Sequence, residues 1–441
     1  MSVFKSSYEI DKKHFNRLLM RFSLPIALQS LMLASVAAAD AFMLGRVAQN
    51  EMTAVSLATQ VQFVQNMFLG AITTAGAILG AQYYGKGDKH TLRDIFNICL
   101  KYAGFVSIIF FILCELTPEY LMLAFTSDAE LIVIGSSYLK IAGWSYLITG
   151  ISQCYLTMMK ITDHVREGAM ISSVAVVSNI VLNALLIFGL LEFTPMRSRG
   201  AAIATTVSRI VELGLCLFIS AGKDHIRPVL SRLVSTSRRL RKDYIRQCMP
   251  LMGGALCWGV GFTSYTAIIG HMGTDAAAAN SIAAVVRDLI CCVCNGIGSA
   301  AGIMVGNEHG SGDLEKGKAY GIRLRNISFL IGFLSTAFVL VITPMIVRSV
   351  ILTDEAREFL TGMMIIMAIY MIGRCVNTVT INGILNGGGD TLFDFYSLIV
   401  CMWLIAIPLA LIGAFVLNWP VLLVYSCTCL DEVGKIPWVM I

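Results

Sequence analysis

The sequence predicts an all-α polytopic membrane protein, with twelve transmembrane helices arranged as two six-helix bundles. Of its 441 residues, 56% are hydrophobic and only 14% are charged, whereas soluble domains have about 25% charged residues. The apolar stretches are long enough for spanning helices, which need ~20 residues, and too long for the ~10-residue strands of a barrel. In addition, the second half of the chain repeats the first. These features exclude a soluble enzyme.

Apolar runs between polar, Pro or Gly residues define the predicted spans. In chain order they cover residues 18–45, 52–79, 95–117, 131–158, 168–191, 200–221, 247–271, 278–305, 324–347, 358–385, 394–416 and 420–441. The third and ninth spans follow the turns GKGD and GSGD, the fourth and tenth follow Asp128 and Asp354, and the eleventh follows GGGD. Gly and Asp at these positions are typical of turns and helix starts.

Charge distribution predicts the orientation of the chain. Most of the 33 Lys and Arg residues lie in the N-terminal tail, the even-numbered connections and the C-terminal end, and five lie in the odd-numbered connections. Positive charge concentrates on the cytoplasmic side of membrane proteins, so both termini are expected there, in the inner or plasma membrane. The net charge of +5 therefore reflects topology, and no nucleic-acid partner is expected.

The internal repeat divides the chain into two lobes. Pro25 matches Pro250, and Gly87-Asp88 matches Gly312-Asp313, both at an offset of 225 residues. We predict an N-terminal six-helix lobe at 1–221, a basic cytosolic linker at 222–246 and a C-terminal six-helix lobe at 247–441. Because each half contains an even number of spans, the halves are parallel repeats, related by a pseudo-two-fold axis along the membrane normal. Such repeats bind substrate between them and work by alternating access.

Glycines and cysteines are assigned to packing. Small residues recur every three to six positions in GAITTAGAILG and GIGSAAGIMVG, a spacing that lets helices approach closely in lipid. The thirteen cysteines mostly lie inside apolar segments without a CxxC pair, and we interpret them as small buried hydrophobic residues. No metal site is assigned to the crowded Cys291, Cys292 and Cys294.

Several longer motifs together resemble one known family. They are LPIALQSLMLASVAAADAFMLGR, LGAQYYGKGD, SNIVLNALLIFG, GAAIATTVSR, VGNEHGSGD and NGGGDT, and they cover nearly the whole chain. The chain is similar to multidrug and toxic compound extrusion (MATE) transporters. That resemblance implies a twelve-helix, two-lobed antiporter that extrudes organic, often cationic, compounds in exchange for H⁺ or Na⁺.

The resemblance also points to a branch of the family. Trp258 stands where the NorM branch has a glutamate, and residues 372–377 contain no carboxylate. The sequence instead resembles the DinF branch, whose key carboxylate lies in the first span, at Asp40. Some members of that branch have an Asp four residues after the Asn of the fifth span, as part of a Na⁺ site. Here the pair is Asn179 and Asn183, which favours H⁺ as the coupling ion, with Na⁺ as the alternative.

Asp40 is the strongest candidate for coupling. An acid at membrane depth costs ~2.5–3.5 kcal/mol on insertion scales, and Asp40 has no cationic residue within one helical turn. Desolvation favours its protonation, which suits a group that loads and releases a proton. The repeat places Tyr265 at the matching position of the second half, so the carboxylate belongs to one lobe. A structural role for this acid is the alternative.

Other polar and aromatic residues are candidates for lining the cavity. The neutral polar candidates are Gln153, Asn179, Asn183 and Thr205, which otherwise would join helices by hydrogen bonds. Arg287 either faces the cavity or bonds carbonyls at a helix end, and an ideal ion pair with the adjacent Asp288 is not expected. Trp258, Phe262 and Tyr265 share one face of the seventh span and could form a wall for a planar cation or simply pack.

The predicted function is secondary active efflux of organic, cationic compounds in exchange for H⁺, with Asp40 as the shared carboxylate. Small organic cations or drugs and the lipid bilayer are the expected partners, and we expect a monomer without a cofactor or bound metal. The main rival is a flippase for lipid-linked oligosaccharides, which would need a strongly cationic cavity. An intramembrane enzyme lacks a visible constellation, since the sequence has neither HExxH nor GxSxG.

Overall fold

A computed structural model of the chain describes residues 10–45, 49–189, 195–222, 224–229, 237–350 and 352–439, without the side chains of 37–42, 45 and 49. The described part is helical and contains no strand. The chain divides into two compact units. We call Leu28–Cys248 the N unit, and Met1–Ala27 with Met249–Ile441 the C unit.

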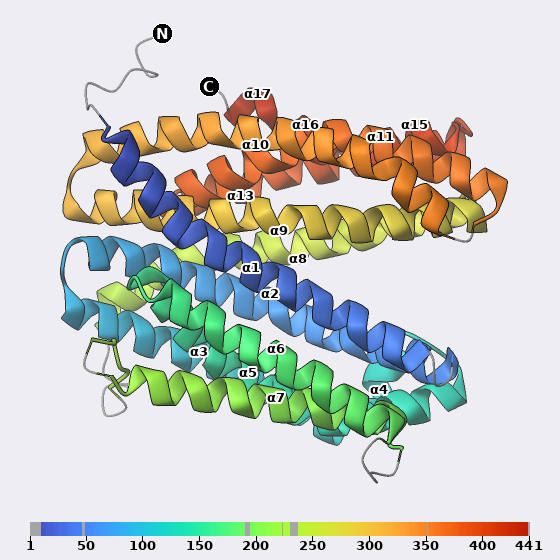
Figure 1. Cartoon of the computed structure of the whole chain (residues 1–441), viewed down its shortest axis with the longest axis horizontal. Helices are drawn as coiled ribbons and strands as arrows, with labels where there is room; N and C mark the ends of the chain where they lie inside the picture. Colours follow the sequence, from blue (N-terminus) through green and yellow to red (C-terminus); the bar gives the residue numbers. More distant parts are fainter. Residues whose placement is uncertain are drawn as a thin grey trace. The chain divides into compact units, whose positions relative to one another are not determined.

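Long helices account for most of both units, as Figure 1 shows. The first half of the chain contains α1 (Lys12–Gly45), α2 (Gln49–Gly85), α3 (Lys89–Leu116), α4 (Pro118–Leu123), α5 (Ala129–Ile161), α6 (Val165–Phe188) and α7 (Arg197–Ser220). The second half opens with α8 (Arg238–His271), α9 (Thr274–Ser311), α10 (Leu314–Ser349) and α11 (Asp354–Asn377). In the described part, eleven helical segments are long and apolar enough to cross a membrane.

Wider π-helical turns interrupt the last part of the chain. After α11 come a π-helical stretch (Thr378–Leu385), α12 (Asn386–Gly388), α13 (Thr391–Leu398), a second π-helical stretch (Ile399–Ala406), α14 (Ile407–Leu411) and a third (Ile412–Val416). The predicted twelfth span, 420–441, is not one continuous helix. It consists of α15 (Val421–Thr428), α16 (Leu430–Val433) and α17 (Ile436–Val439), because charged residues and Gly434 interrupt the apolar run.

The first helix of each half is shared between the units. Residues before Leu28 in α1 belong to the C unit, where Phe15 packs edge-on against Tyr320 and Arg323 donates to Asn16 at 3.0 Å. In the matching part of α8, the hydroxyl of Tyr244 donates to the carbonyl of Ile72 in the N unit. These boundaries differ from the predicted lobes, which followed chain order alone.

The predicted linker is also shorter than expected. Helix α8 begins at Arg238, so residues 238–246 of the predicted linker 222–246 are helical. The basic side chains there suited a surface connection, but Arg and Lys are also good helix formers. Between α7 and α8, residues 224–229 are described and residues 230–236 lie outside the described part.

The repeated turns have the same local structure in both halves. Gly87 and Gly312 both have positive φ values, +78° and +86°, which glycine adopts without strain. Asp88 then caps α3 by accepting from the amide of Thr91, and Asp313 caps α10 by accepting from the amide of Lys316. Hydrogen bonds from the hydroxyl and amide of Thr91 lower the pKa of Asp88. The match between these turns confirms the repeat at this point.

Glycine packing joins α9 to the stretch that follows α11. A Cβ at Gly383 would lie 2.7 Å from the carbonyl oxygen of Gly298, and one at Gly387 would lie 2.7 Å from that of Gly302. Both glycine pairs are four residues apart, so each helix presents a small-residue face to the other. The assignment of the glycines in GIGSAAGIMVG to packing is therefore confirmed for Gly298 and Gly302.

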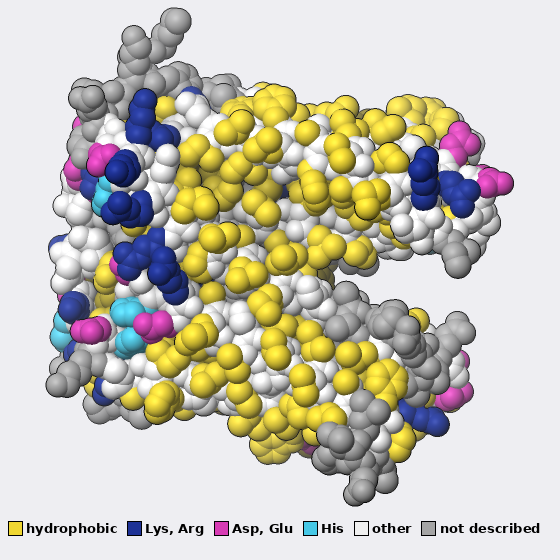
Figure 2. All heavy atoms as spheres, in the orientation of Figure 1, with side chains coloured by type: hydrophobic (Ala, Val, Ile, Leu, Met, Phe, Trp, Pro, Cys, Tyr) yellow, Lys and Arg dark blue, Asp and Glu magenta, His cyan; other side chains and the backbone are white. Residues whose placement is uncertain are grey.

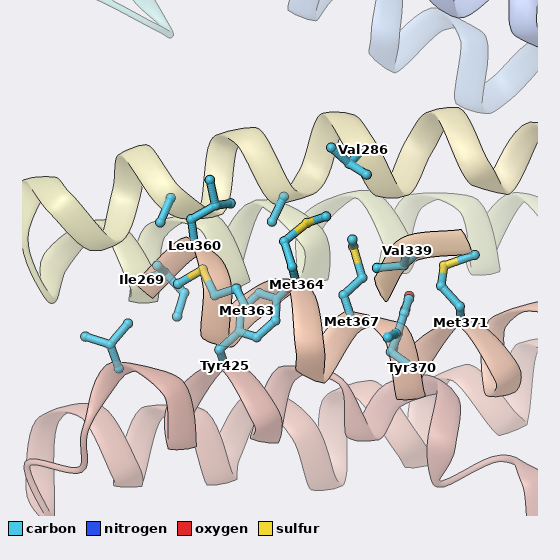
Figure 3. Close-up of a cluster of buried hydrophobic side chains, with 14 of the residues drawn as sticks. Ile269, Val286, Val339, Leu360, Met363, Met364, Met367, Tyr370, Met371 and Tyr425 are labelled. Atoms are coloured by element: carbon cyan, nitrogen blue, oxygen red, sulfur yellow. The ribbon is translucent and has the colours of Figure 1, made fainter. Parts of the chain in front are cut away.

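Methionines fill much of the C-unit core. Met363, Met364, Met367 and Met371 are fully buried on one side of α11, and Figure 3 shows them directed toward neighbouring helices. Their unbranched side chains adapt to irregular gaps between helices. These four methionines therefore serve packing and do not line the C-unit cavity described below.

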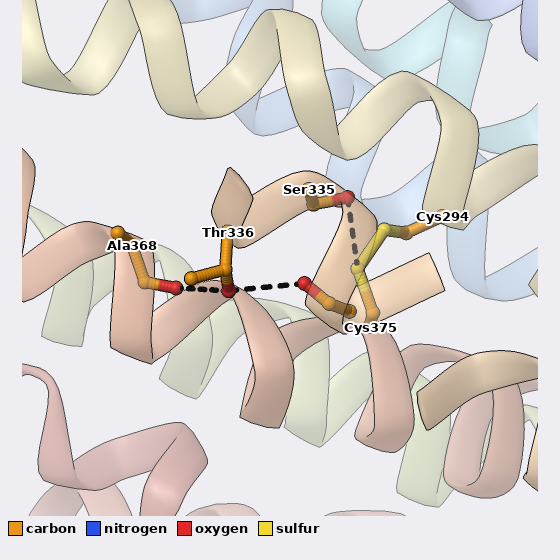
Figure 4. Close-up of a disulfide and its surroundings, with 6 residues drawn as sticks. Cys294, Ser335, Thr336, Ala368 and Cys375 are labelled. Carbon is orange, nitrogen blue, oxygen red and sulfur yellow. Dashed lines mark hydrogen bonds between the residues drawn. A yellow bond between two sulfur atoms is a disulfide. The ribbon is translucent and has the colours of Figure 1, made fainter. Parts of the chain in front are cut away.

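Two cysteines do more than fill space. Figure 4 shows a disulfide between Cys294 of α9 and Cys375 of α11, with Cα atoms 5.3 Å apart. Next to it, Thr336 of α10 donates to the carbonyl of Ala368 at 2.6 Å. The interpretation of the cysteines as small buried hydrophobic residues is wrong for this pair. The two residues are 81 positions apart in sequence, so their contact in the fold could not be recognised from their spacing. The other eleven cysteines are free and mostly buried.

The helix surfaces suit a lipid environment. Large apolar side chains such as Phe105, Phe218, Leu330 and Val341 are more than half exposed. On the face drawn in Figure 2, hydrophobic side chains cover the middle of the helices of each unit and charged ones gather near the helix ends. This distribution is typical of multi-pass membrane proteins.

Candidate functional site: one cavity in each unit

The N unit contains a cavity of about 470 Å³. Helices α1, α2, α5, α6 and α7 line it, and its wall combines apolar residues such as Leu33 and Val36 with neutral polar ones. Three of the predicted candidates, Gln153, Asn179 and Thr205, are among the lining residues. The fourth, Asn183, is fully buried behind them and does not line the cavity.

A chain of amide and hydroxyl groups supports this wall. Asn183 donates to the side-chain oxygen of Asn179 at 3.1 Å, and Asn179 donates to the hydroxyl of Thr205 at 3.4 Å. Asn179 and Asn183 are four residues apart on α6, so they share one helix face. Asn183 thus orients Asn179, which is itself buried and lines the cavity.

Helix α2 supplies a polar face that the sequence analysis missed. Thr59, Gln62, Asn66 and Thr73 all line the N-unit cavity. Their spacing of three, four and seven residues is that of one side of an α-helix. This period was visible in the sequence, but it was overlooked because each residue is neutral and the segment as a whole is apolar.

The N-unit cavity also has one charged residue among its described lining residues, Arg209. Arg209 is bonded to Glu212, three residues on in α7, with 2.5 Å between Nη1 and Oε2. Glu212 is almost completely buried. The guanidinium charge is therefore compensated by a carboxylate that does not itself line the cavity.

The side chain of Asp40 lies outside the described part of the structure. Its backbone belongs to α1. Position 40 comes four residues after Val36, which lines the cavity.

The C unit contains a second, smaller cavity of about 210 Å³. All three predicted aromatic residues, Trp258, Phe262 and Tyr265, line it from α8. The rings of Trp258 and Phe262 are stacked, with centroids 5.4 Å apart and an interplanar angle of 15°. The spacing of these residues on one helix face therefore does bring them to one wall.

Arg287 lies in the same cavity and occupies the aromatic surface. Its guanidinium carbon is 4.6 Å from the ring centroid of Phe262, and its Nε and Nη2 donate to Asp288 at 3.0 and 2.9 Å. An ideal ion pair between these adjacent residues was not expected, and both arginine nitrogens contact the same oxygen, Oδ1, of the exposed Asp288. The chain's own cation thus covers the face that a planar cation would use.

The residues that the sequence analysis missed in the C unit are charged and buried. Glu432 accepts from Arg374 at 2.5 Å and from Asn377 at 2.8 Å, and Lys435 lies 3.7 Å from its second carboxylate oxygen. The pair joins α11 to α16, 58 positions away in sequence. The signal was the motif DEVGK, residues 431–435, inside an apolar segment.

Asp431 differs from its neighbour Glu432. Its side chain is 5% exposed and lines the C-unit cavity. One of its carboxylate oxygens is buried without a hydrogen-bond partner. A buried carboxylate that is not fully bonded can exchange a proton or bind a cation more readily than one held by an arginine and an amide. The C-unit cavity therefore has a carboxylate of its own, supplied by α16.

Comparisons with known proteins agree with this architecture. A sequence profile of the MatE family matches residues 25–185 and again residues 250–412. Relatives include the probable multidrug resistance protein NorM of Thermotoga maritima, 22% identical over 89% of this chain and 84% of that protein. The NorM of Bradyrhizobium diazoefficiens is 25% identical, over 90% of this chain and 86% of its own. The uncharacterized transporter YisQ of Bacillus subtilis is 22% identical over 93% and 90%.

Solved structures show the same fold at 16% identity. A multidrug resistance MATE family transporter of the MOP superfamily, in an outward-facing conformation, has a TM-score of 0.86 over 97% of this chain and 95% of its own. A MOP superfamily transporter from Pyrococcus furiosus, described as having a binding pocket of reverse polarity, has a TM-score of 0.87 over 97% and 94%. Because the profile matches twice and covers most of the sequence, this chain belongs to the MatE family of membrane transporters.

Proposed function

We propose that this transporter exports organic cations in exchange for protons. The relatives named as multidrug resistance proteins support drug efflux. The observation that carries the proposal is the N-unit cavity, whose volume of about 470 Å³ falls within the ~300–1,000 Å³ typical of small-molecule sites. Its wall combines apolar residues such as Leu33 and Val36 with a similar share of neutral polar ones, which suits lipophilic substrates that also carry hydrogen-bonding groups.

Charge balance supports Asp40 as the coupling residue. Arg209, the charged residue of the described wall, is already paired with Glu212, so its guanidinium would not be free to neutralise an ionised Asp40. Residues four apart share a helix face, and Asp40 follows the cavity-lining Val36 by four. We infer that Asp40 attracts a cation when ionised and releases it when protonated, so substrate and proton exclude one another.

The residues that line the N-unit cavity also bear on the identity of the coupling ion. The amide oxygen of Asn179 already accepts from Asn183, and no second carboxylate lines the described part of the N-unit cavity. A tight Na⁺ site would need more free oxygen ligands, so we favour H⁺ over Na⁺. A carboxylate in the first span and Trp258 in the seventh favour the DinF-like branch.

A flippase for lipid-linked oligosaccharides is the second candidate, and charge pairing argues against it. Such a substrate carries a pyrophosphate, which needs unpaired positive charge. In the C-unit cavity Arg287 is bonded to Asp288, and Arg374 to Glu432. We further propose that the protein is a monomer in the inner or plasma membrane with both termini in the cytoplasm.

The proposal is tested by efflux of a fluorescent lipophilic cation from reconstituted vesicles. A pH gradient and a Na⁺ gradient are applied separately to the intact protein, to Asp40→Asn and to Asp354→Asn. Asp354 is an exposed acid at the start of α11 and serves as the control. We expect the pH gradient alone to drive transport in the intact protein and in the control, and Asp40→Asn to abolish it. Transport by Asp40→Asn, or transport driven by Na⁺ alone, would overturn the coupling scheme.

A further inference from the structure

Three side chains that commonly bind transition metals meet in the N unit outside its cavity. They are His164, Glu167 and His225, and one ligand atom from each lies within 4.8 Å of the others. Nε2 of His225 is 2.7 Å from a carboxylate oxygen of Glu167. The imidazole rings of His164 and His225 are in contact, tilted by 35° with centroids 4.1 Å apart. None of the three lines either cavity.

The turn between α5 and α6 places two of these residues. Asp163 has a positive φ of +70°, which reverses the chain after α5, and His164 follows as the N-cap of α6. The backbone amide of His164 donates to the carbonyl of Met159 at 2.9 Å. Glu167 is three residues further on, in the first turn of α6, so both side chains lie on the same side of the helix start.

The third residue is held by the segment after α7. Arg227 donates to the carbonyl oxygens of Ser220, Ala221 and Gly222, which folds this segment back on the end of the helix. Asn97 of α3 fixes its far end through two hydrogen bonds with the backbone of Val229, at 3.2 and 3.0 Å. His225 lies between these two anchors, so its position beside Glu167 is built into the fold.

The chemistry of the three groups matches one class of ion. Two imidazole nitrogens and one carboxylate oxygen form a ligand set used for Zn²⁺, with a fourth position left for water. Two ligand atoms of a tetrahedral zinc ion, each at ~2.0–2.1 Å from the metal, lie about 3.3 Å apart. The ligand atoms all lie within 4.8 Å of one another, and the 2.7 Å between Nε2 of His225 and Glu167 is a hydrogen-bond distance. Side-chain rotations must therefore open that pair and bring the third ligand closer when an ion binds.

A hydrogen-bonded cluster without a metal is the competing explanation, because Nε2 of His225 is bonded to Glu167 and Nδ1 of His164 lies 3.3 Å from the hydroxyl of Thr162. These hydrogen bonds do not account for the close contact between the two imidazole rings. Two imidazole rings in contact also repel each other when both are protonated, whereas a shared cation holds two neutral rings together. The cluster is therefore better suited to a metal ion than to a pair of charged histidines.

We propose that His164, Glu167 and His225 form a Zn²⁺ site that fastens the segment after α7 to the start of α6. This departs from the expectation, drawn from the sequence, that no metal is bound. The site secures the chain where it leaves α7 on its way to α8. The proposal is independent of the coupling ion and of the transported substrate.

Metal titration of the full-length, tag-free protein in detergent tests the site. Zn²⁺ affinity is measured by competition with a chromophoric chelator for the intact protein, for His225→Asn, for His164→Asn and for His90→Asn. His90 is an exposed histidine at the start of α3, 3.7 Å from Asp94, and serves as the matched control. We expect one Zn²⁺ per chain for the intact protein and the control, and at least tenfold weaker binding for the other two variants.

A second readout covers the case in which a variant folds poorly. The melting temperature is measured with Zn²⁺ and with Mg²⁺, which prefers oxygen ligands. Zn²⁺ but not Mg²⁺ should raise it in the intact protein and in His90→Asn, and should leave it unchanged in Glu167→Gln or His225→Asn. Absence of Zn²⁺ binding by the intact protein, or equal binding by His225→Asn, would overturn the proposal.

Discussion

At the scale of single residues, two adjacent acids in α16 have different environments. Glu432 is held by Arg374, Asn377 and Lys435. Asp431 faces the cavity, with one oxygen lacking a hydrogen-bond partner. Both are almost completely buried. Neighbouring carboxylates therefore separate into a structural one and one that is available to a ligand or proton.

Replacing each acid with its amide should affect stability differently: a loss is expected at Glu432 but not at Asp431. Glu432→Gln leaves Arg374 buried without its ionic partner, and loss of one member of a buried pair costs about 3–5 kcal/mol. Asp431→Asn removes an incompletely bonded charge, so it should leave the melting temperature unchanged or raise it. Thermal unfolding of both variants in detergent is the measurement. Equal losses of stability would show that the two carboxylates share one network.

At the scale of elements, the contact between α9 and the stretch after α11 depends on the absence of side chains. Gly298 and Gly302 meet Gly383 and Gly387 backbone to backbone. Close approach of this kind replaces the hydrophobic effect, which does not drive helices together in lipid. Gly388 is the useful contrast, because a Cβ there would meet nothing within 4 Å.

Alanine substitution at the two neighbouring glycines should separate packing from helix propensity. In Gly387→Ala the new methyl group meets the carbonyl oxygen of Gly302 at 2.7 Å, so α9 must move, at a cost of about 1–3 kcal/mol. In Gly388→Ala the methyl group enters open space. Because alanine lowers the conformational entropy of the unfolded chain, we expect the free energy of unfolding to rise by about 0.4–1 kcal/mol. Melting temperatures in the same detergent measure both effects. A similar decrease in both variants would contradict the packing argument.

At the scale of the whole molecule, hydropathy correctly predicted the spanning helices, whose formation depends on local composition. Long apolar runs with turn residues between them correctly predicted α2, α3, α5, α6 and α7 in the first half. Hydropathy failed at residues 420–441, because averaging hides the effect of Asp431 and Glu432 on the helix. Contacts between distant segments, such as Cys294 with Cys375 and the start of α1 with α10, could not be predicted from chain order. The aromatic residues of α8 could be grouped, since helical spacing is local, but their partner Arg287 could not be identified from spacing alone.

The proposed exchange of one proton for one monovalent cation predicts electroneutral transport. Each cycle moves one positive charge in either direction through the same cavity, so the membrane potential contributes no driving force. Each unit of pH difference then supplies ~1.4 kcal/mol. Vesicles with the potential clamped by K⁺ and valinomycin, at a fixed pH gradient, provide the measurement. We expect the same efflux rate at zero and at negative potential, after correction with protein-free vesicles because a lipophilic cation also distributes passively.

A rate that changes with potential would indicate unequal charge movement, for which Asp431 in the C-unit cavity offers a second proton-binding carboxylate. In that case Asp431→Asn should restore potential-independent transport, and a potential-dependent Asp431→Asn variant would exclude this residue as the source.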